Sequence, residues 1–118
     1  DFSYTHRVNS DHKLRFRINA SLINQYEKLG IQVSMRMLTT TPPPIDTLLL
    51  PEELVKLSFI NEGIILVCGT TGSGKSTLLA SMLALRAAKS VSGEKIITFE
   101  SPIEYILPAY TENSITSQ

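Results

Sequence analysis

The feature that most constrains this chain is the octapeptide Gly69–Ser76, which reads Gly-Thr-Thr-Gly-Ser-Gly-Lys-Ser. It fits the pattern G-x-x-x-x-G-K-S, which requires a strand before it and a helix after it. The continuous apolar run Ile64–Cys68 predicts that strand, buried on both faces. Ser76–Lys89 carries apolar residues at helical spacing and predicts the helix. The order strand, loop, helix indicates an α/β fold.

The octapeptide has the chemistry of a phosphate-binding loop, or P-loop. Its glycines allow close approach of the backbone, and the amides of Gly72–Lys75 should point into one concavity at the positive end of the helix. Lys75 is placed to neutralise β- and γ-phosphate oxygens, and the Ser76 hydroxyl to ligate magnesium. The alternative is a chance match in a Gly- and Ser-rich turn. We therefore expect ATP with Mg2+ as ligands, and the predicted nucleotide-binding residues are Gly69, Thr71, Gly72, Ser73, Gly74, Lys75, Ser76 and Thr77.

Two segments upstream of the loop alternate between polar and apolar side chains. Lys13–Ala20 and Ile31–Met37 both have a period of two, which is typical of half-buried strands. Pairing these strands would gather Arg15, Arg17 and Arg36 on one polar surface. Periodicity alone favours a solvated surface, because such faces usually meet water.

The segments around these strands indicate how the chain is divided. Leu22–Gly30 is long for a hairpin connection and leaves room for a helical turn. Pro42–Pro44 lacks backbone donors at three successive positions, which predicts an extended connector and a domain boundary. A helix should begin at Leu50–Glu53 and stop by Asn61–Gly63. The predicted parts are an N-terminal domain at 1–41, a linker at 42–48 and a second domain at 49–118.

A second group of candidate residues follows the predicted helix. Lys95–Phe99 predicts the next strand, and Glu100 stands at its carboxyl end, where ligands bind in open α/β sheets. A carboxylate at that position can orient the attacking water or accept its proton. Spacing alone slightly favours the alternative, in which Glu100 and Glu104 are ordinary surface acids.

Composition narrows the remaining functions. Eleven basic and eleven acidic residues cancel, so no strong field favours nucleic acid or anionic lipid, and no direct nucleic-acid binding is predicted. No apolar run approaches the roughly 18–20 residues that span a bilayer. Cys68 is the single cysteine and should pack as a small buried hydrophobe. His6 and His12 have no third ligand at metal spacing and are expected on the surface.

Taken in order, these segments resemble a known family. The stretches Arg15–Ala20 and Met35–Leu38, the P-loop sequence GTTGSGKSTLLA and the later sequence ITFESPIEY follow one another as in the secretion-ATPase superfamily. That superfamily drives type II and type IV secretion, pilus retraction and conjugation. The chain is most similar to its Dot/Icm-type and plasmid conjugal-transfer ATPases, over nearly its whole length.

The resemblance implies an architecture and a setting. Members join a PAS-like N-terminal domain to a RecA-like domain, assemble as a hexameric ring and hydrolyse ATP to move partner proteins. The implied fold is the end of the PAS-like domain followed by the beginning of the RecA-like P-loop domain. The implied partners are other subunits of the ring and components of an inner-membrane secretion machinery. The implied location is cytoplasmic, peripheral to the inner membrane through those partners.

The resemblance also implies roles for particular side chains. Glu100 matches the catalytic acid of a box at Thr98–Glu104, with Glu104 a second acid, and Lys75 acts on the phosphates. Arg17 and Arg36 match the N-domain arginines that reach the nucleotide, while Arg15 fits this role less well.

The chain departs from the family pattern in two ways. Ser101 stands where an acid usually follows Glu100, and neither a Walker B acid nor a His box occurs before Gln118. The chain is therefore expected to be a fragment that is inactive by itself.

Two other functions stay open at this point. A transporter-type nucleotide-binding domain also uses GSGKSTLL, although the proline run and the arginine-bearing strands do not fit it. A binding or assembly module without catalysis is the second alternative, because the P-loop could hold nucleotide while other residues complete the chemistry.

Overall fold

The computed structural model describes residues 2–7, 13–25, 28–91, 93–109, 111 and 114–118. The chain divides into two compact units. The first is made of Asp1–Thr40 and Ser101–Glu104, and the second of Thr41–Glu100 and Tyr105–Gln118. Both sheets and helices occur, so the expected mixed α/β class is confirmed.

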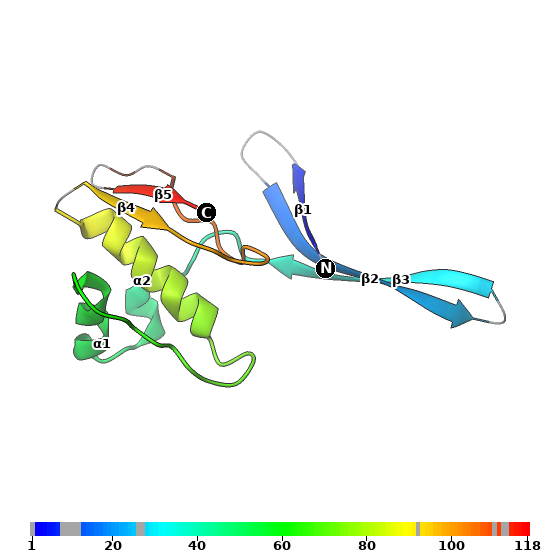
Figure 1. Cartoon of the computed structure of the whole chain (residues 1–118), viewed down its shortest axis with the longest axis horizontal. Helices are drawn as coiled ribbons and strands as arrows, with labels where there is room; N and C mark the ends of the chain where they lie inside the picture. The colour runs from blue at the N-terminus through cyan, green and yellow to red at the C-terminus, as the bar shows by residue number, and fades with distance from the viewer. Residues whose placement is uncertain (1, 8–12, 26–27, 92, 110, 112–113) are drawn as a thin grey trace. The chain divides into compact units, whose positions relative to one another are not determined.

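The first unit contains a three-stranded antiparallel sheet in the order β1-β2-β3 (Figure 1). Its strands are β1 (Phe2–Arg7), β2 (Lys13–Gln25) and β3 (Lys28–Leu38). The two predicted alternating strands are therefore present, and both are longer than predicted. β1 was not predicted, although its sequence alternates in the same way.

The prediction of a long connection at Leu22–Gly30 is wrong. β2 and β3 continue through this segment as paired strands, with Leu22 opposite Ile31 and Gln25 opposite Lys28. Antiparallel pairing lets the backbone donors and acceptors of one strand bond to those of the other. A helical turn would have to satisfy the same groups by bonds within one segment. The result is a long two-stranded hairpin.

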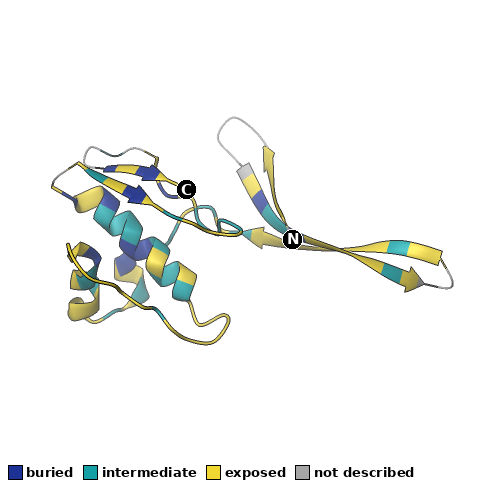
Figure 2. Ribbon diagram, in the orientation of Figure 1, coloured by how far each residue is buried: buried dark blue, intermediate teal, exposed yellow. Residues whose placement is uncertain are grey.

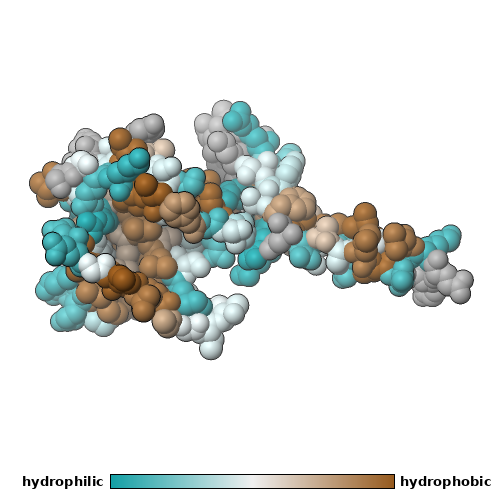
Figure 3. All heavy atoms as spheres, viewed as in Figure 1, coloured by the Kyte–Doolittle hydropathy of each residue, from teal (hydrophilic) through white to brown (hydrophobic). Residues whose placement is uncertain are grey.

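The strand register assigns the side chains of the hairpin to two faces. Arg17 lies directly opposite Arg36, and both share their face with Arg15, so the predicted common polar surface is confirmed. Phe16 opposite Met37 belongs to the other, apolar face. Much of that face is exposed, and Figure 3 shows apolar side chains gathered along the hairpin. Its exposed members include Leu22, Ile31, Val33, Met35 and Met37.

The second unit is built around α2 (Lys75–Lys89), which packs against a two-stranded parallel sheet of β4 (Glu94–Ile97) and β5 (Ser114–Ser117). Figure 2 shows buried positions on all three elements. The Thr111 and Ser114 hydroxyls both donate to the Ala87 carbonyl, at 2.7 and 3.1 Å, and tie the helix to the segment around β5. The buried apolar side chains of this unit are Ile45, Met82, Ala87, Ile96 and Leu107.

Shorter helical elements precede the P-loop. They are the 3-10 helix η1 (Ile45–Leu48), the helix α1 (Glu52–Lys56) and the 3-10 helix η2 (Leu57–Phe59). The last two confirm the helix predicted before the P-loop. Within the described residues, no helix is long and apolar enough to cross a membrane.

The prediction of a buried strand at Ile64–Cys68 is wrong. The segment belongs to no strand, and Ile64 and Leu66 are 86% and 81% exposed. A strand needs a neighbour for its backbone hydrogen bonds, and the sheet described in this unit contains only β4 and β5. Cys68 is exposed for the same reason, so its prediction as a buried hydrophobe is also wrong.

Arg86 holds the elements of the second unit together. Its guanidinium forms a two-pronged ion pair with Glu94 at the start of β4, with N···O distances of 2.6 and 2.8 Å. It also donates to the carbonyls of Ser58 and Ile60, at 3.1 and 2.7 Å. Hydrogen bonding to Glu94 raises the pKa of Arg86, and the same bond holds the pKa of the Glu94 carboxyl below its ordinary value of 4.5.

We expect Glu94→Gln to lower the free energy of unfolding by about 2 kcal/mol at pH 7, because charge-assisted hydrogen bonds contribute roughly this much. A lowered carboxyl pKa stabilises the fold fully above about pH 4.5 and loses that effect as pH falls through the lowered value. The difference in melting temperature between wild type and variant should therefore narrow below pH 4.5.

The matched control is Glu52→Gln. Glu52 pairs with Lys56 at 2.9 Å on the exposed surface of α1, where ion pairs contribute little. Equal losses of melting temperature in the Glu94 and Glu52 variants would contradict the role assigned to Arg86.

Candidate functional site

The P-loop has a backbone that only glycine readily adopts. Gly74 has φ +89° and forms the N-cap of α2, in the left-handed region that disfavours other residues. A Cβ on Gly69 would lie 2.8 Å from the Ser73 hydroxyl oxygen, which is too close for any real contact. The loop therefore closes tightly and leads directly into the positive end of a 15-residue helix.

Polar groups of the loop already bond to one another. The Lys75 ammonium donates to the Thr70 carbonyl at 2.7 Å. The Ser73 amide donates to the same carbonyl at 3.2 Å, so it serves a turn, whereas the sequence predicted that it points into the concavity. The Thr70 carbonyl thus holds the ammonium of Lys75, the first residue of α2, against the loop.

A cavity of about 540 Å³ opens beside this loop. Gly69 and Lys75 line it on the polar side. The apolar side of the cavity includes Leu48 from η1, Leu50 shortly after η1, and Leu78 from α2. Its size lies within the range of small-molecule sites, and its mixed lining suits a ligand with one charged and one apolar part.

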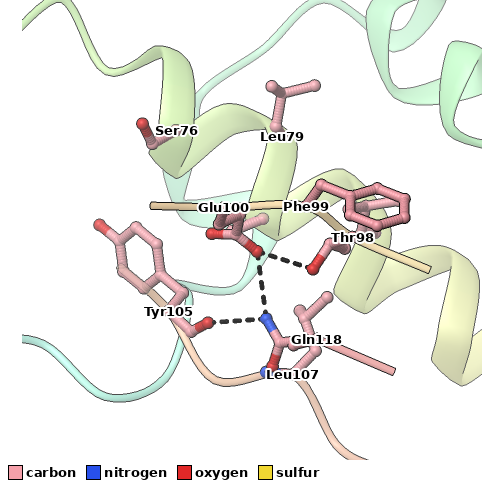
Figure 4. Close-up of a pocket in the computed structure, with 10 residues that line it drawn as sticks. Ser76, Leu79, Thr98, Phe99, Glu100, Tyr105, Leu107 and Gln118 are labelled. Carbon is pink, nitrogen blue, oxygen red and sulfur yellow. Dashed lines mark hydrogen bonds between the residues drawn. The ribbon is translucent and has the colours of Figure 1, made fainter. Parts of the chain in front are cut away.

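A second cavity, of about 280 Å³, brings Ser76 and Glu100 together (Figure 4). Ser76 comes from the first turn of α2, and Glu100 follows β4 by three residues. Sequence separates these residues by one helix and one strand, yet both line the same space. Glu100 thus lies beyond the carboxyl end of β4 and shares a cavity with the P-loop helix, although the P-loop strand that the sequence predicted beside β4 is not part of the described sheet.

Hydrogen bonds fix the Glu100 carboxylate. Its Oε1 accepts from the Thr98 hydroxyl at 2.9 Å and from the Gln118 side-chain amide at 3.3 Å (Figure 4). The same Gln118 nitrogen donates to the Tyr105 carbonyl at 2.9 Å, and the Leu107 amide donates to the Gln118 oxygen at 2.9 Å. Sequence reasoning gave Gln118 no role, because no spacing pattern links it to a residue 18 positions earlier.

Thr77, a predicted phosphate ligand, lies within 2.9 Å of the Tyr105 hydroxyl. Either hydroxyl can be the donor of this hydrogen bond. Tyr105 also lines the cavity shared by Ser76 and Glu100, and the sequence gave no signal for it. It therefore contacts the P-loop helix through its side chain and Gln118 through its main chain.

The arginines of the first unit have different environments. Arg15 is only 5% exposed and donates to the Ile103 carbonyl at 2.6 Å and to the Glu104 carbonyl at 3.3 Å. The expectation of a solvated face is therefore wrong for Arg15, because the segment Ser101–Glu104 covers it. Arg17 lies 4.0 Å from the Glu104 carboxylate, and Arg36 is exposed.

The two histidines are the remaining candidates from the sequence. The His6 ring stacks on Tyr4 with centroids 6.5 Å apart, and His12 lies outside the described residues. In the part of the chain that the structure describes, no three side chains of His, Cys, Asp or Glu come together as metal ligands. Ser76 and Glu100 both line the smaller cavity, and oxygen donors of this kind suit a hard cation such as Mg2+.

A comparison with protein families matches residues 5–118 to the type II/IV secretion system proteins. The chain belongs to this family. The predicted resemblance to secretion and pilus ATPases is thereby confirmed. Relatives include the type IV pilus ATPase PilU of Pseudomonas aeruginosa, 39% identical over 92 residues, and the type IV pilus retraction ATPase PilT of the same organism, 35% identical over 92 residues.

Solved structures agree with this type II/IV secretion family assignment. The ATPase DotB of Legionella pneumophila is similar with a TM-score of 0.85 at 38% identity, and the pilus retraction motor PilT with bound ADP has a TM-score of 0.73 at 32% identity. These matches cover 100% and 99% of this chain, but 32% and 31% of those chains. Likewise, 78% of this chain matches only 22% of PilU and 25% of PilT from P. aeruginosa.

For this secretion-family chain, we expect Arg15→Ala to destabilise the first unit by about 2 kcal/mol, because two carbonyls lose charged donors. Relative to wild type, the rate of amide hydrogen exchange should increase more in Ser101–Glu104 than elsewhere in the chain.

Arg36→Ala is the matched control, since Arg36 is an exposed arginine on the same face of the sheet. It should leave exchange in Ser101–Glu104 unchanged. Unchanged exchange in the Arg15 variant would contradict its role in holding this segment.

Proposed function

We propose that this chain is the nucleotide-binding part of an ATPase that couples ATP hydrolysis to protein export or pilus movement. The observation that carries this proposal is the shared cavity of Ser76 and Glu100, beside a glycine loop that leads into a helix N-terminus. Support also comes from relatives named as pilus ATPases and from a similar motor, PilT, with bound ADP.

The P-loop residues fit a magnesium nucleotide. Lys75 would exchange its neutral partner, the Thr70 carbonyl, for phosphate oxygens, which attract an ammonium more strongly because they are charged. The Ser76 hydroxyl would ligate magnesium, and Thr77 would reach the α-phosphate. Magnesium, when bound, would neutralise charge on the β- and γ-phosphate oxygens. The cavity lined by Leu48, Leu50 and Leu78 offers space for the nucleoside.

Glu100 would act on the attacking water. It is exposed at the end of β4 and lines the cavity next to Ser76, so a water there can reach both side chains. A fixed carboxylate orients this water and can accept its proton. Glu104 has a different partner, Arg17 at 4.0 Å, and would contribute less to the reaction.

Arg17 and Arg36 would supply positive charge to the triphosphate. They lie directly opposite each other on β2 and β3, an arrangement of like charges that costs free energy unless anions compensate. Glu104 provides one carboxylate for Arg17, and a nucleotide phosphate would provide further negative charge. Guanidinium suits this role, because it stays charged and can bind two phosphate oxygens at once.

The larger setting follows the family. We propose that the three-stranded unit ends a PAS-like domain, that 42–48 is the linker and that the P-loop unit begins a RecA-like domain. The complete protein would form a hexameric ring, so that arginines can act at subunit boundaries. Its partners would be components of an inner-membrane secretion or pilus machinery, to which it would attach from the cytoplasm.

We expect Lys75→Ala to reduce ATP turnover by the complete protein to background. The variant loses the Lys75 ammonium, which would neutralise charge on the β- and γ-phosphate oxygens. That interaction would stabilise the transition state by several kcal/mol. Steady-state phosphate release measures this effect. Lys89→Ala, at the other end of α2, is the matched control and should keep wild-type turnover. Turnover by the Lys75 variant within threefold of wild type would refute the proposed function.

The arginine pair is tested in the same assay. Arg17→Ala and Arg36→Ala should each lower turnover by about tenfold or more, because an arginine on a triphosphate can contribute up to about 10³–10⁵ in rate. The Arg36 variant should keep its melting temperature, since exposed-face substitutions change stability little. Normal turnover in both variants would show that neither arginine acts on the nucleotide.

A further inference from the structure

We propose that Gln118 is a positioning residue for Glu100, and that hydrolysis depends on the hydrogen bond between their side chains. This inference rests on the proposed function, because it concerns the acid of the same site. Gln118 donates to Glu100 Oε1 at 3.3 Å and lines the cavity that holds Ser76 and Glu100 (Figure 4).

The orientation of the Gln118 amide is set by its surroundings. Its nitrogen faces two acceptors, Glu100 Oε1 and the Tyr105 carbonyl at 2.9 Å, and its oxygen faces the Leu107 amide donor at 2.9 Å. An amide has two N–H donors and one carbonyl acceptor, so each group finds a partner of the right kind. Turning the amide over would place its oxygen against two acceptors and its nitrogen against a donor. Gln118 is therefore held in the one orientation that donates to Glu100.

This hydrogen bond limits how the carboxylate can turn. Oε1 receives both hydrogen bonds that the described residues give to this carboxylate, one from Thr98 at 2.9 Å and one from Gln118. Glu100 follows β4 in an exposed, irregular segment, where packing does little to hold its side chain. Anchoring one oxygen leaves the lone pairs of the other for a water molecule. An acid that is held in place avoids the cost of finding its geometry in each reaction cycle.

A purely structural role for Gln118 makes a different prediction. Leu107 is 4% exposed, and its amide would lack a partner without the Gln118 oxygen. Gln118→Glu keeps the contact with the Leu107 amide, because a glutamate still accepts there, but it can donate neither to Glu100 nor to the Tyr105 carbonyl. The new carboxylate also faces the Glu100 carboxylate with like charge. A role limited to the Leu107 contact therefore predicts that this variant keeps its turnover, and a wider structural role predicts a lower melting temperature. A positioning role predicts lost turnover with the fold kept.

The test measures kcat, KM for ATP and melting temperature in the complete protein. We expect Gln118→Glu to lower kcat by about tenfold or more while KM changes less than about threefold, because ground-state binding is kept. Gln118→Met, which is uncharged and similar in length, should also lower kcat. Ser117→Ala, an exposed neighbour on β5, is the matched control and should match wild type. Unchanged kcat in both Gln118 variants, or loss of fold in both, would overturn the proposal.

A double variant tests whether Gln118 acts through Glu100. Glu100→Gln should reduce turnover strongly, and adding Gln118→Glu should reduce it no further, since the group to be positioned is gone. A further tenfold fall in the double variant would mean that Gln118 acts independently, and would overturn the proposal.

The same experiments separate this inference from the proposed function. Normal turnover in Lys75→Ala would refute ATP hydrolysis at this P-loop, whatever the Gln118 variants do. Loss of turnover in Lys75→Ala and Glu100→Gln, together with wild-type turnover in Gln118→Glu, would refute only the role of Gln118.

Discussion

The ion pair between Arg86 and Glu94 is the interaction on which the second unit depends. Arg86 lies in the last turn of α2, and Glu94 begins β4. The P-loop stands at the other end of α2, and Glu100 follows the other end of β4. Fixing the helix to the strand at one end therefore sets how far apart Ser76 and Glu100 lie at the other. The spacing of the candidate site therefore depends on an ion pair at the far ends of α2 and β4.

Short-range patterns allowed the sequence to predict the tight glycine loop before α2, α2 itself and the two long strands. Glycine chemistry, helical spacing and strict alternation are properties of neighbouring residues, so they can be read without a structure. The segment Ile64–Cys68 shows the limit of such patterns. Apolar residues show that a segment could be buried in a sheet, but a strand forms only where a partner supplies hydrogen bonds. In contrast, β5 does pair in the sheet but was not predicted, because its four largely polar residues show no strand pattern.

Long-range contacts decide what the periodicity of the hairpin left open. Alternation placed Arg15, Arg17 and Arg36 on one face, and the register confirms this. Alternation could not show that the segment Ser101–Glu104 covers Arg15, because those contacts join residues 88 and 89 positions apart. One face thus contains a buried arginine that binds main-chain carbonyls and an exposed one, Arg36, opposite Arg17. Arg15 holds the segment Ser101–Glu104, whereas the binding of phosphate by Arg17 and Arg36 belongs to the proposed function.

The polar groups of the candidate site form one connected set. The Thr77 and Tyr105 hydroxyls are hydrogen-bonded, the Tyr105 carbonyl accepts from Gln118, and Gln118 donates to Glu100. A phosphate that binds at Thr77 would compete with the Tyr105 hydroxyl, just as a phosphate at Lys75 would compete with the Thr70 carbonyl. Charged oxygens can displace these neutral partners because charge-assisted hydrogen bonds are about twice as strong. Tyr105 thereby connects Thr77, the proposed α-phosphate ligand, with Gln118, the proposed positioning residue for Glu100.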